Sequence, residues 1–235
     1  FPMFDEKEHF NCAAMRQEME GLLEKQKQVL LVLNTPANNP TGYSMTAEEM
    51  DQTVEIIRDL GMKYPEKKIT LCLDVSYIDF DDTFENSRKI FDSIHDMPEN
   101  TMTLVVFSMS KSYTMCGVRC GALVCLGETK EAAGLFKAAM SYSSRSVWSN
   151  VVRMAQRILV DINLNPETRD QVAREREKFS RLITERGETF YQEAIRVNLS
   201  CCPYKHGYFV AIPCRYPEKA AEILCNDRVF VVPQS

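Results

Sequence analysis

The sequence predicts an α/β fold in which helices flank a mostly parallel sheet. Four short, largely apolar runs alternate with longer segments of helical composition. This alternation favours parallel strands, because a parallel connection needs a crossover that is usually a helix. Three of the runs lead into polar residues, and ligands bind at that edge of an open α/β sheet. With 235 residues, the chain is long enough to bury a substantial core.

Composition and charge argue against several classes of function. The net charge is −5, and no clustered basic residues indicate a nucleic-acid partner. No apolar run approaches the roughly 20 residues that span a bilayer, and residues 1–10 do not resemble a signal peptide. The nine cysteines show no CxxC spacing, which fits free thiols in a reducing compartment. We therefore expect a cytoplasmic protein with no nucleic-acid or membrane partner and no metal site.

The first helix is predicted over residues 12–27, which are rich in Met, Glu, Gln and Leu. The run at 29–33 is fully apolar, a pattern typical of a strand buried on both faces of a parallel sheet. It ends in a loop over 34–42, which two prolines, three asparagines and a glycine make rigid.

The second helix is predicted to start after Thr46, the N-cap, and to end near Lys63. Glu49 stands three residues after Thr46, the spacing of a capping box. A second strand is predicted over 69–73 and leads directly to Asp74. We expect this carboxylate to lie at the ligand-binding edge of the sheet.

Two further strands are predicted over 103–107 and 122–125. Before them, the acidic residues 79–82 are expected to form a solvated turn, and residues 87–95 a helix. The third strand leads to Lys111. An unpaired ammonium group is costly to bury, so we expect a partner for Lys111 nearby.

The second half is predicted to be mainly helical. Helices are expected over 128–142 and 147–162, with the serine-rich residues 143–146 separating them. Asn165 as N-cap and Pro166 at the first helical position start a long, charged helix.

The charged residues 174–178 of this long helix are expected to form a solvated face. In the tail, a helix is predicted over 217–225, between strands over 207–212 and 229–232. We therefore expect part of a large domain (1–165), a connecting helix (166–197) and an incomplete small domain (198–235).

The candidate site combines Asn39, Asp74 with Tyr77, and Lys111 with Arg119, which follow three predicted strands. The carboxyl ends of parallel strands share one edge, so these side chains can converge. A lysine can form a Schiff base with an aldehyde cofactor, and a buried carboxylate can keep a pyridine nitrogen protonated. A guanidinium with hydroxyls can bind a phosphate. Each residue alone has an ordinary structural explanation, so the inference depends on their joint occurrence.

Three motifs of the candidate site, in their order along the chain, resemble those of the fold-type I pyridoxal-phosphate (PLP) aminotransferases of class I and II. The resemblance is strong over about residues 29–125 and looser beyond them. The run from Ser110 to Met115 looks most similar to the aspartate and aromatic amino-acid branch. The motifs are Asn39-Pro40-Thr41-Gly42, Asp74-x-x-Tyr77, and Ser108-x-Ser110-Lys111 followed by Arg119-x-Gly121.

By this resemblance, Lys111 would be the catalytic residue. It would carry the cofactor as a Schiff base and then move a proton between the substrate α-carbon and the cofactor C4′. Asp74 would pair with the pyridinium nitrogen. Tyr77 and Asn39 would contact the 3-oxygen of the ring.

The resemblance also implies a phosphate site and a substrate residue. Ser108 and Arg119 would bind the phosphate, with Ser110 as a further contact. Arg145 lies in a segment similar to the one that reaches the neighbouring subunit's active site, where it would pair with the distal carboxylate of a dicarboxylic substrate. The alternative for Arg145 is a solvent-exposed arginine between helices. A shared site implies a homodimer.

The implied reaction transfers an amino group from an amino acid, expected to be aspartate or aromatic, to a 2-oxo acid such as 2-oxoglutarate. This chemistry belongs to amino-acid metabolism and biosynthesis. Two alternatives stay open: a PLP-dependent lyase or decarboxylase on the same fold, and a catalytically incompetent fragment that keeps the scaffold.

Some of the family's pattern is missing, so we expect an internal piece of a longer protein. The Gly-rich phosphate turn and the ring-stacking aromatic residue do not occur in residues 1–28. Arg228 is not in the context of the arginine that binds the α-carboxylate. We expect these 235 residues alone to bind PLP weakly and to turn over inefficiently. An absorbance titration tests this, and full occupancy with sustained transamination would contradict it.

Overall fold

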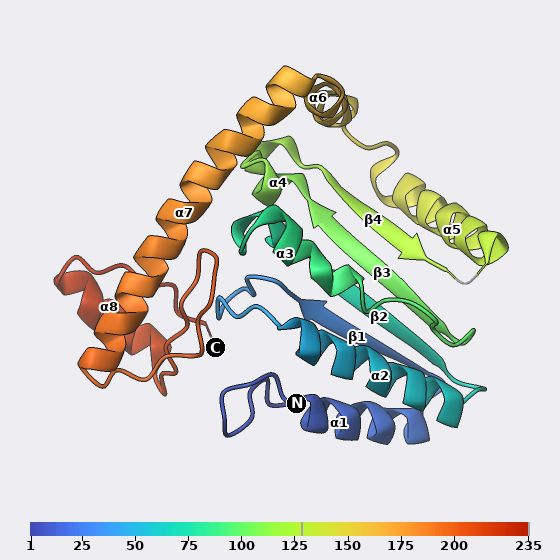
Figure 1. Ribbon diagram of the computed structural model, residues 1–235, viewed down its shortest axis with the longest axis horizontal. Helices are drawn as coiled ribbons and strands as arrows, with labels where there is room; N and C mark the ends of the chain where they lie inside the picture. Colours follow the sequence, from blue (N-terminus) through green and yellow to red (C-terminus); the bar gives the residue numbers. More distant parts are fainter. Residues whose placement is uncertain (128, 235) are drawn as a thin grey trace.

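The computed structural model describes residues 1–127 and 129–234 and contains a four-stranded, mixed sheet flanked by helices (Figure 1). The first three strands are parallel and adjacent in chain order, and the fourth is antiparallel to the third. The predicted α/β class with a mostly parallel sheet is therefore confirmed. The strands are β1 (Gln28–Asn34), β2 (Lys68–Asp74), β3 (Thr101–Ser108) and β4 (Gly121–Leu126).

The pairing register brings the strand ends of interest to one edge of the sheet. Asn34 at the end of β1 pairs with Asp74 at the end of β2, and Asp74 pairs with Val106 of β3. Because β4 is antiparallel, its first residue, Gly121, pairs with Ser108, the last residue of β3. The segment that precedes β4 therefore lies at the same edge as the segments that follow β1, β2 and β3.

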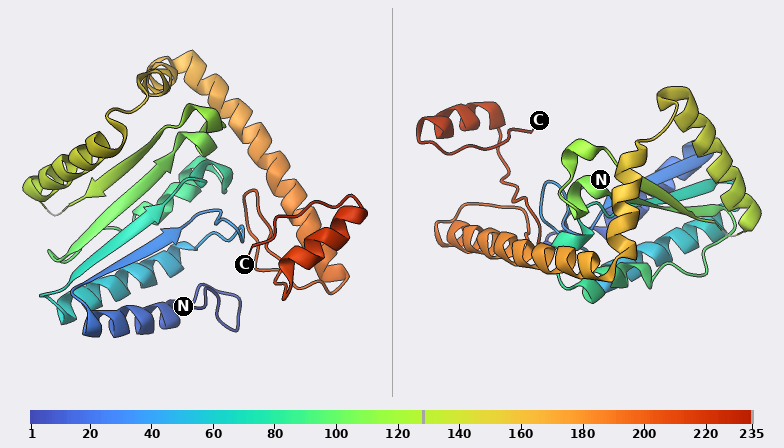
Figure 2. Two further views of the ribbon diagram at one scale, coloured as in Figure 1. Left: turned by 180° about the vertical axis from the view of Figure 1, so that it is seen from behind. Right: turned by 90° about the horizontal axis from the view of Figure 1, so that it is seen from above.

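Helices α1 (Cys12–Lys25) and α2 (Ala47–Lys63) pack on one face of this sheet (Figures 1 and 2). Every second side chain of a strand points toward these helices, and each helix turns one apolar stripe toward the sheet. This interface forms the apolar core. Its fully or almost fully buried members include Met15 and Leu23 of α1, Met50, Val54, Ile57 and Leu60 of α2, and Leu31, Leu33, Leu71 and Leu73 of the sheet.

The opposite face of β1 corrects one prediction. Leu30 is 61% exposed and Val32 is 57% exposed, so the strand is buried on one face and not on both. These side chains alternate with Val29, Leu31 and Leu33, which point toward α1 and α2. An apolar run predicts a strand, but it does not show which segment covers each face.

The start of α2 confirms the predicted capping box. The Glu49 amide donates to Thr46 Oγ1 (3.2 Å), and the Thr46 amide donates to Glu49 Oε2 (2.8 Å). Glu49 Oε1 also accepts from the Phe10 amide (2.8 Å) and from the Tyr43 hydroxyl (2.6 Å). Burial and the Glu49 carboxylate raise the pKa of Tyr43, so its hydroxyl stays protonated and donates. Glu49 thus connects the N-terminal segment, the loop after β1 and α2.

Two predicted helices have different bounds in the structure. The helix expected over 87–95 is replaced by a short helix α3 (Phe84–Arg88) and a 3₁₀ turn η2 (Lys89–Phe91). Helix α5 (Lys130–Trp148) continues through the serines expected to interrupt it. The Ser146 hydroxyl donates to the Ser143 carbonyl (2.9 Å), a bond that keeps serine compatible with a helix. The expected start at Glu128 lies outside the described residues.

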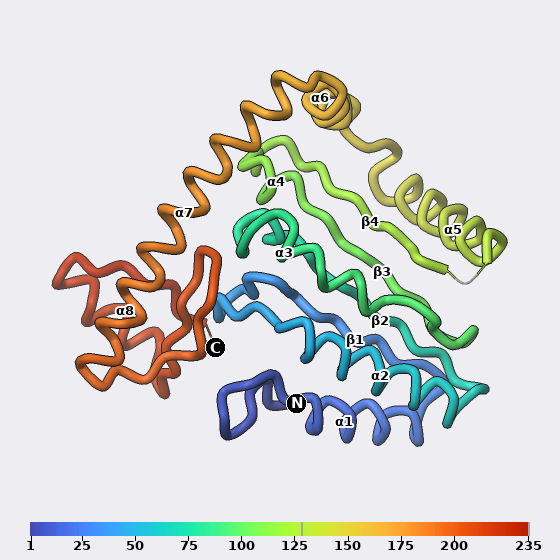
Figure 3. Tube along the Cα trace, viewed as in Figure 1, coloured from blue at the N-terminus to red at the C-terminus, as the bar shows by residue number. Residues whose placement is uncertain are grey.

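The chain leaves the helical conformation only at Ser149, which has φ +65°, and resumes it in α6 (Arg153–Leu164). Helix α7 (Pro166–Arg196) starts as predicted, with the Thr168 amide donating to the side chain of Asn165 (3.1 Å). It leads from α6 at one corner of the molecule to the C-terminal segment (Figure 3). The division into domains stays a prediction.

The C-terminal segment contains the predicted helix, α8 (Pro217–Asn226), but not the two predicted strands. Residues 207–212 and 229–232 are irregular, because a β-strand needs a neighbouring strand to bond its backbone. No such neighbour is present for either segment among residues 1–127 and 129–234. The remaining short elements are η1 (Ile78–Phe80), α4 (Met109–Ser112) and η3 (Cys116–Val118).

Residues after α7 return to the loop that follows β1. The amides of Lys205 and His206 donate to the Gly42 carbonyl (2.9 and 3.0 Å), and Lys205 Nζ donates to the Ser44 carbonyl (2.9 Å). The buried ring of Tyr204 lies between Gly42 and Gly187 of α7, and a Cβ on either glycine would overlap it. These contacts join α7, the tail and the Asn39–Gly42 motif.

Gly187→Ala is expected to destabilise this junction by about 1–3 kcal/mol, since the added Cβ would lie 2.0 Å from the Tyr204 hydroxyl oxygen. Urea denaturation monitored by tyrosine fluorescence measures the loss. The matched control is Gly134→Ala in α5, where no described atom lies within 4 Å of the new Cβ. Alanine there favours the helix by up to about 1 kcal/mol. Equal stabilities for the two variants would contradict the prediction.

Candidate active site

Lys111 lies one turn after β3, in the short helix α4. The neighbouring Met109 and Ser112 are buried, at 0% and 1% exposed, and hold this turn against the core. The Lys111 side chain points back toward the end of β2. Its Nζ lies 5.5 Å from the centre of the Tyr77 ring, within cation–π range. Lys111 is half-buried, and the aromatic ring beside it does not neutralise its charge as a carboxylate would.

The end of β2 presents Asp74 and Tyr77. Asp74 Oδ1 accepts from the Ser76 amide (3.0 Å) and from the Ser76 hydroxyl (2.5 Å), which orient the half-buried carboxylate. Tyr77 is 5% exposed, and its hydroxyl oxygen accepts a long hydrogen bond from Asn39 Nδ2 (3.4 Å). The structure thus brings Asn39, Tyr77 and Lys111 together at one edge of the sheet.

Asn34, the last residue of β1, connects two of these segments. Its Oδ1 accepts from the Asn39 amide (2.7 Å), and its Nδ2 donates to the Asp74 carbonyl (3.1 Å). One side chain therefore fixes the spacing between the Asn39 loop and the end of β2. Its position as the first polar residue after an apolar run was visible in the sequence, but this contact was not predicted.

The candidate phosphate residues lie where β3 ends and β4 begins. Arg119 Nη1 donates to Ser110 Oγ (3.3 Å) and to the Cys116 carbonyl (2.7 Å). Ser108 pairs with Gly121, and the Met109 amide donates to the Cys120 carbonyl (3.0 Å). Arg119 has φ +56°, a conformation that is strained for a residue with a Cβ and that recurs at functional sites. A guanidinium and hydroxyls therefore gather in one exposed turn.

Arg145 is not brought into this group. It is exposed in the last turn of α5 and donates to the Ser149 carbonyl (3.3 Å). Within the described chain it forms no hydrogen bond or ion pair with another candidate residue. Its assignment to a substrate stays a prediction, as do the roles of the other candidate residues.

Asp79 corrects the predicted solvated turn. Its side chain is only 5% exposed and forms ion pairs with Arg88 and with Arg176 of α7. Phe80 is also buried, at 1% exposed. The prediction of a solvated face holds for the neighbours of Arg176, but Arg176 itself is 19% exposed and paired. The Asp79–Arg176 contact joins residues 97 positions apart, so no local sequence signal could reveal it.

The tail adds two aromatic residues that the sequence did not suggest for the site. The ring centres of Tyr208 and Phe209 lie 6.1 and 5.8 Å from that of Tyr77. The Tyr208 ring also lies 4.7 Å from Phe80. Burial, with a smaller effect of Tyr77, raises the pKa of Tyr208 to about 12, so its hydroxyl stays protonated at neutral pH. The tail therefore contacts the residue that stands beside Lys111.

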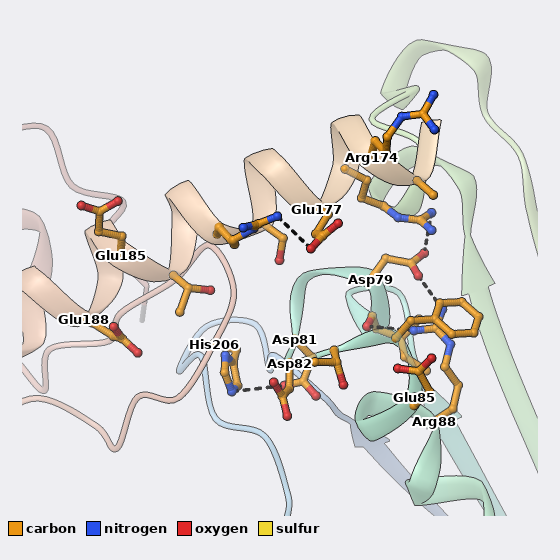
Figure 4. A pocket seen from close by; sticks show the side chains of 18 residues that line it. Asp79, Asp81, Asp82, Glu85, Arg88, Arg174, Glu177, Glu185, Glu188 and His206 are labelled. Carbon is orange, nitrogen blue, oxygen red and sulfur yellow. Dashed lines mark hydrogen bonds and ion pairs between the residues drawn. The ribbon is translucent and has the colours of Figure 1, made fainter. Parts of the chain in front are cut away.

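A cavity of about 730 Å³ lies next to this group, between α7 and the segment after β2 (Figure 4). Charged side chains line both walls, among them Asp79, Asp82 and Arg88 on one side and Arg174 and Glu177 on the other. None of the eight candidate residues lines it. The cavity is therefore a neighbour of the candidate site and not the site itself.

Two kinds of feature are absent from residues 1–127 and 129–234. No three His, Cys, Asp or Glu side chains in that part of the chain are placed to hold a metal ion. None of its helices is both long and apolar enough to cross a membrane.

Comparison with known sequences matches residues 4–235 to the family model of aminotransferases of class I and II. A similar curated protein is the probable aspartate/prephenate aminotransferase of Aquifex aeolicus. It is 29% identical over 231 residues, which are 92% of this chain and 52% of that protein. The chain spans about half or less of the length of the curated relatives it matches.

Solved structures are similar as well. An aminotransferase from Anaerococcus prevotii superposes with a TM-score of 0.94 at 30% identity, over 99% of this chain and 56% of that one. An aromatic-amino-acid aminotransferase from Burkholderia pseudomallei, solved with covalently bound pyridoxal phosphate, superposes with a TM-score of 0.64 at 22% identity. That match covers 79% of this chain and 44% of the other, and at this identity it supports the fold alone.

Proposed function

The chain belongs to the class I and II aminotransferases of PLP fold type I, and from this premise we propose that the protein containing it moves an amino group from an amino acid to a 2-oxo acid. The observation that carries the proposal is the convergence of Lys111, Tyr77 and Asn39 at one sheet edge. An amine, a phenol and an amide from three separate strand ends have no shared structural purpose that requires all three. They suit a ligand that bears an aldehyde and a ring oxygen.

The side chains present fit pyridoxal phosphate by their chemistry. The site offers one amine (Lys111), one oriented carboxylate (Asp74), neutral donors, and a guanidinium with hydroxyls. When bound, the cofactor supplies an aldehyde that combines with amines and a ring that withdraws electrons. Lys111, together with Ser108, Ser110 and Arg119, would hold the cofactor.

Two residues carry the proton chemistry in this proposal. Lys111 Nζ acts as general base and removes the proton from the α-carbon of the amino acid. Asp74 would hold the ring nitrogen in its protonated form, because a carboxylate placed beside a pyridine nitrogen favours the charged form. The two hydrogen bonds from Ser76 support this role, since they fix the carboxylate in one orientation.

The remaining residues orient and bind. Tyr77 and Asn39 would donate hydrogen bonds to the ring oxygen, and their mutual contact holds both side chains together. Arg119, Ser110 and Ser108 bind the phosphate. A planar guanidinium suits a phosphate, because two of its N–H groups can point at two oxygens.

The substrate range is also proposed. The Aquifex aeolicus relative is named as a probable aspartate/prephenate aminotransferase, and the run from Ser110 to Met115 resembles the aspartate and aromatic amino-acid branch. We therefore propose aspartate or an aromatic amino acid as the donor and 2-oxoglutarate as an acceptor. Arg145, from one subunit of a homodimer, would bind the distal carboxylate. We propose a cytoplasmic location on the sequence argument alone.

The test is to follow glutamate formation from 2-oxoglutarate by the whole protein, with aspartate and the aromatic amino acids as donors and with PLP present or removed by dialysis. We expect PLP-dependent glutamate formation with at least one of these donors. If the donor loses carbon dioxide or another fragment and no glutamate is formed, the result would favour a lyase or decarboxylase. No turnover of any donor would favour a scaffold without catalysis.

A further inference from the structure

Arg176 of helix α7 contacts two of the segments that carry the candidate site. Its Nη1 donates to Asp79 Oδ2 (3.2 Å) and to the carbonyl oxygen of Ser112 (3.3 Å). Asp79 lies between α7 and Arg88, at one end of the charged cavity (Figure 4). A single guanidinium nitrogen therefore joins a residue after β2 to a residue after β3.

The two acceptors lie within two residues of the candidate side chains. Ser112 follows Lys111 directly, and Asp79 comes two residues after Tyr77. Lys111 Nζ and the Tyr77 ring centre are 5.5 Å apart. Any change in the distance between the two turns therefore changes the distance between the amine and the phenol.

The burial of this contact shows that it differs from a surface ion pair. The Asp79 side chain is 5% exposed and Arg176 is 19% exposed. A carboxylate as buried as that of Asp79 needs charged partners, and Asp79 in turn holds the side chains of Arg88 and Arg176 in place. The guanidinium carbon of Arg176 also lies 5.8 Å from the centre of the Tyr113 ring, whose hydroxyl accepts from Asn163 of α6 (3.2 Å).

We propose that Arg176 is a positioning residue that sets the separation between Lys111 and Tyr77 from outside the site. The inference rests on the proposed function, since it concerns how that site is held. Its consequence is that the C-terminal part of the chain, through α7, affects the chemistry of the lysine. The groups that face Arg176 are Asp79, Arg88 beyond it, the Ser112 carbonyl and Tyr113.

The decisive readout is the pH midpoint of the absorbance change of PLP bound to the whole protein. Hydrogen bonds donated to the ring oxygen stabilise its anionic form and so lower this midpoint. If Arg176 keeps Tyr77 in place, Arg176→Gln raises the midpoint by about half a pH unit or more. Asp79→Asn is also expected to raise the midpoint. The double variant should raise it no further than either single variant, because both substitutions remove the same Arg176–Asp79 contact.

The matched control is Arg181→Gln, five residues along the same helix. Arg181 forms an exposed ion pair with Glu177, so this variant loses the same charge without touching the site. Its midpoint is expected to equal that of the unmodified protein. Arg176→Lys keeps the charge but not the planar donor geometry, and we expect an intermediate shift.

The outcomes separate this inference from the proposed function. If the unmodified protein shows no absorbance of bound PLP, the proposed function fails first. If it binds PLP and Arg176→Gln titrates like Arg181→Gln, the positioning role is wrong. Should Arg176→Gln fail to fold, unchanged midpoints in both Arg176→Lys and Asp79→Asn would overturn the inference, and shifts in both would support it.

Discussion

Replacing Lys111 with alanine is expected to abolish the covalent attachment of PLP and to reduce amino-group transfer by about 10³-fold or more. The reason is that Lys111 is the amine at the sheet edge beside Tyr77, where it would both bind the cofactor and move the substrate proton. Borohydride reduction followed by peptide mass mapping measures the attachment. Initial rates with PLP in excess measure the transfer.

A matched control uses another lysine. Lys137→Ala removes an exposed lysine of α5 and should leave both PLP attachment and the rate unchanged. Reduction of the unmodified protein should label the peptide that contains Lys111. Label on a different lysine, or equal labelling of Lys111→Ala, would show that the cofactor lysine has been assigned wrongly.

Glu49→Ala is expected to lower the free energy of unfolding by about 3–5 kcal/mol. The substitution leaves three donors without their acceptor: the amides of Thr46 and Phe10 and the hydroxyl of Tyr43. Tyr43 is 1% exposed and Phe10 is 6% exposed, so water cannot easily replace the carboxylate. An unsatisfied buried donor costs about 1–3 kcal/mol, and the lost cap adds about 1 kcal/mol.

Urea denaturation with an unchanged m-value would measure this loss cleanly. Glu48→Ala is the matched control, because Glu48 is the preceding residue of the same helical turn and is exposed. A change within about 0.5 kcal/mol is expected there. If Glu49→Ala were no more destabilised than Glu48→Ala, the three hydrogen bonds accepted by Glu49 would not contribute as argued.

Local features were predictable because their causes lie within a few residues of chain. The capping box depends on the three-residue spacing of Thr46 and Glu49, and α7 begins at Asn165 and Pro166 for the same kind of reason. The strands followed from their apolar runs. The convergence of Asn39, Tyr77 and Lys111 was also predictable, since parallel strands end at a common edge.

Other predictions failed where the answer depends on partners distant in the chain. Serine content did not interrupt α5, because a serine hydroxyl can bond within the helix. Residues 207–212 have strand composition but no neighbouring strand among the described residues, so they stay irregular. The exposed Leu30 and Val32 show the same limit, since alternation within one run cannot reveal which faces are covered.

The sequence by itself determined the fold class, the starts of α2 and α7, and the group of residues that meet beside Lys111, because each depends on local spacing or on the common direction of parallel strands. Only the tertiary structure decided that Asp79 is buried between two arginines, that Arg176 contacts the turn after Lys111, and that Tyr204 lies between Gly42 and Gly187. The physical reason is that these contacts join segments far apart in sequence, and their energies come from burial and pairing that exist only once the chain has folded.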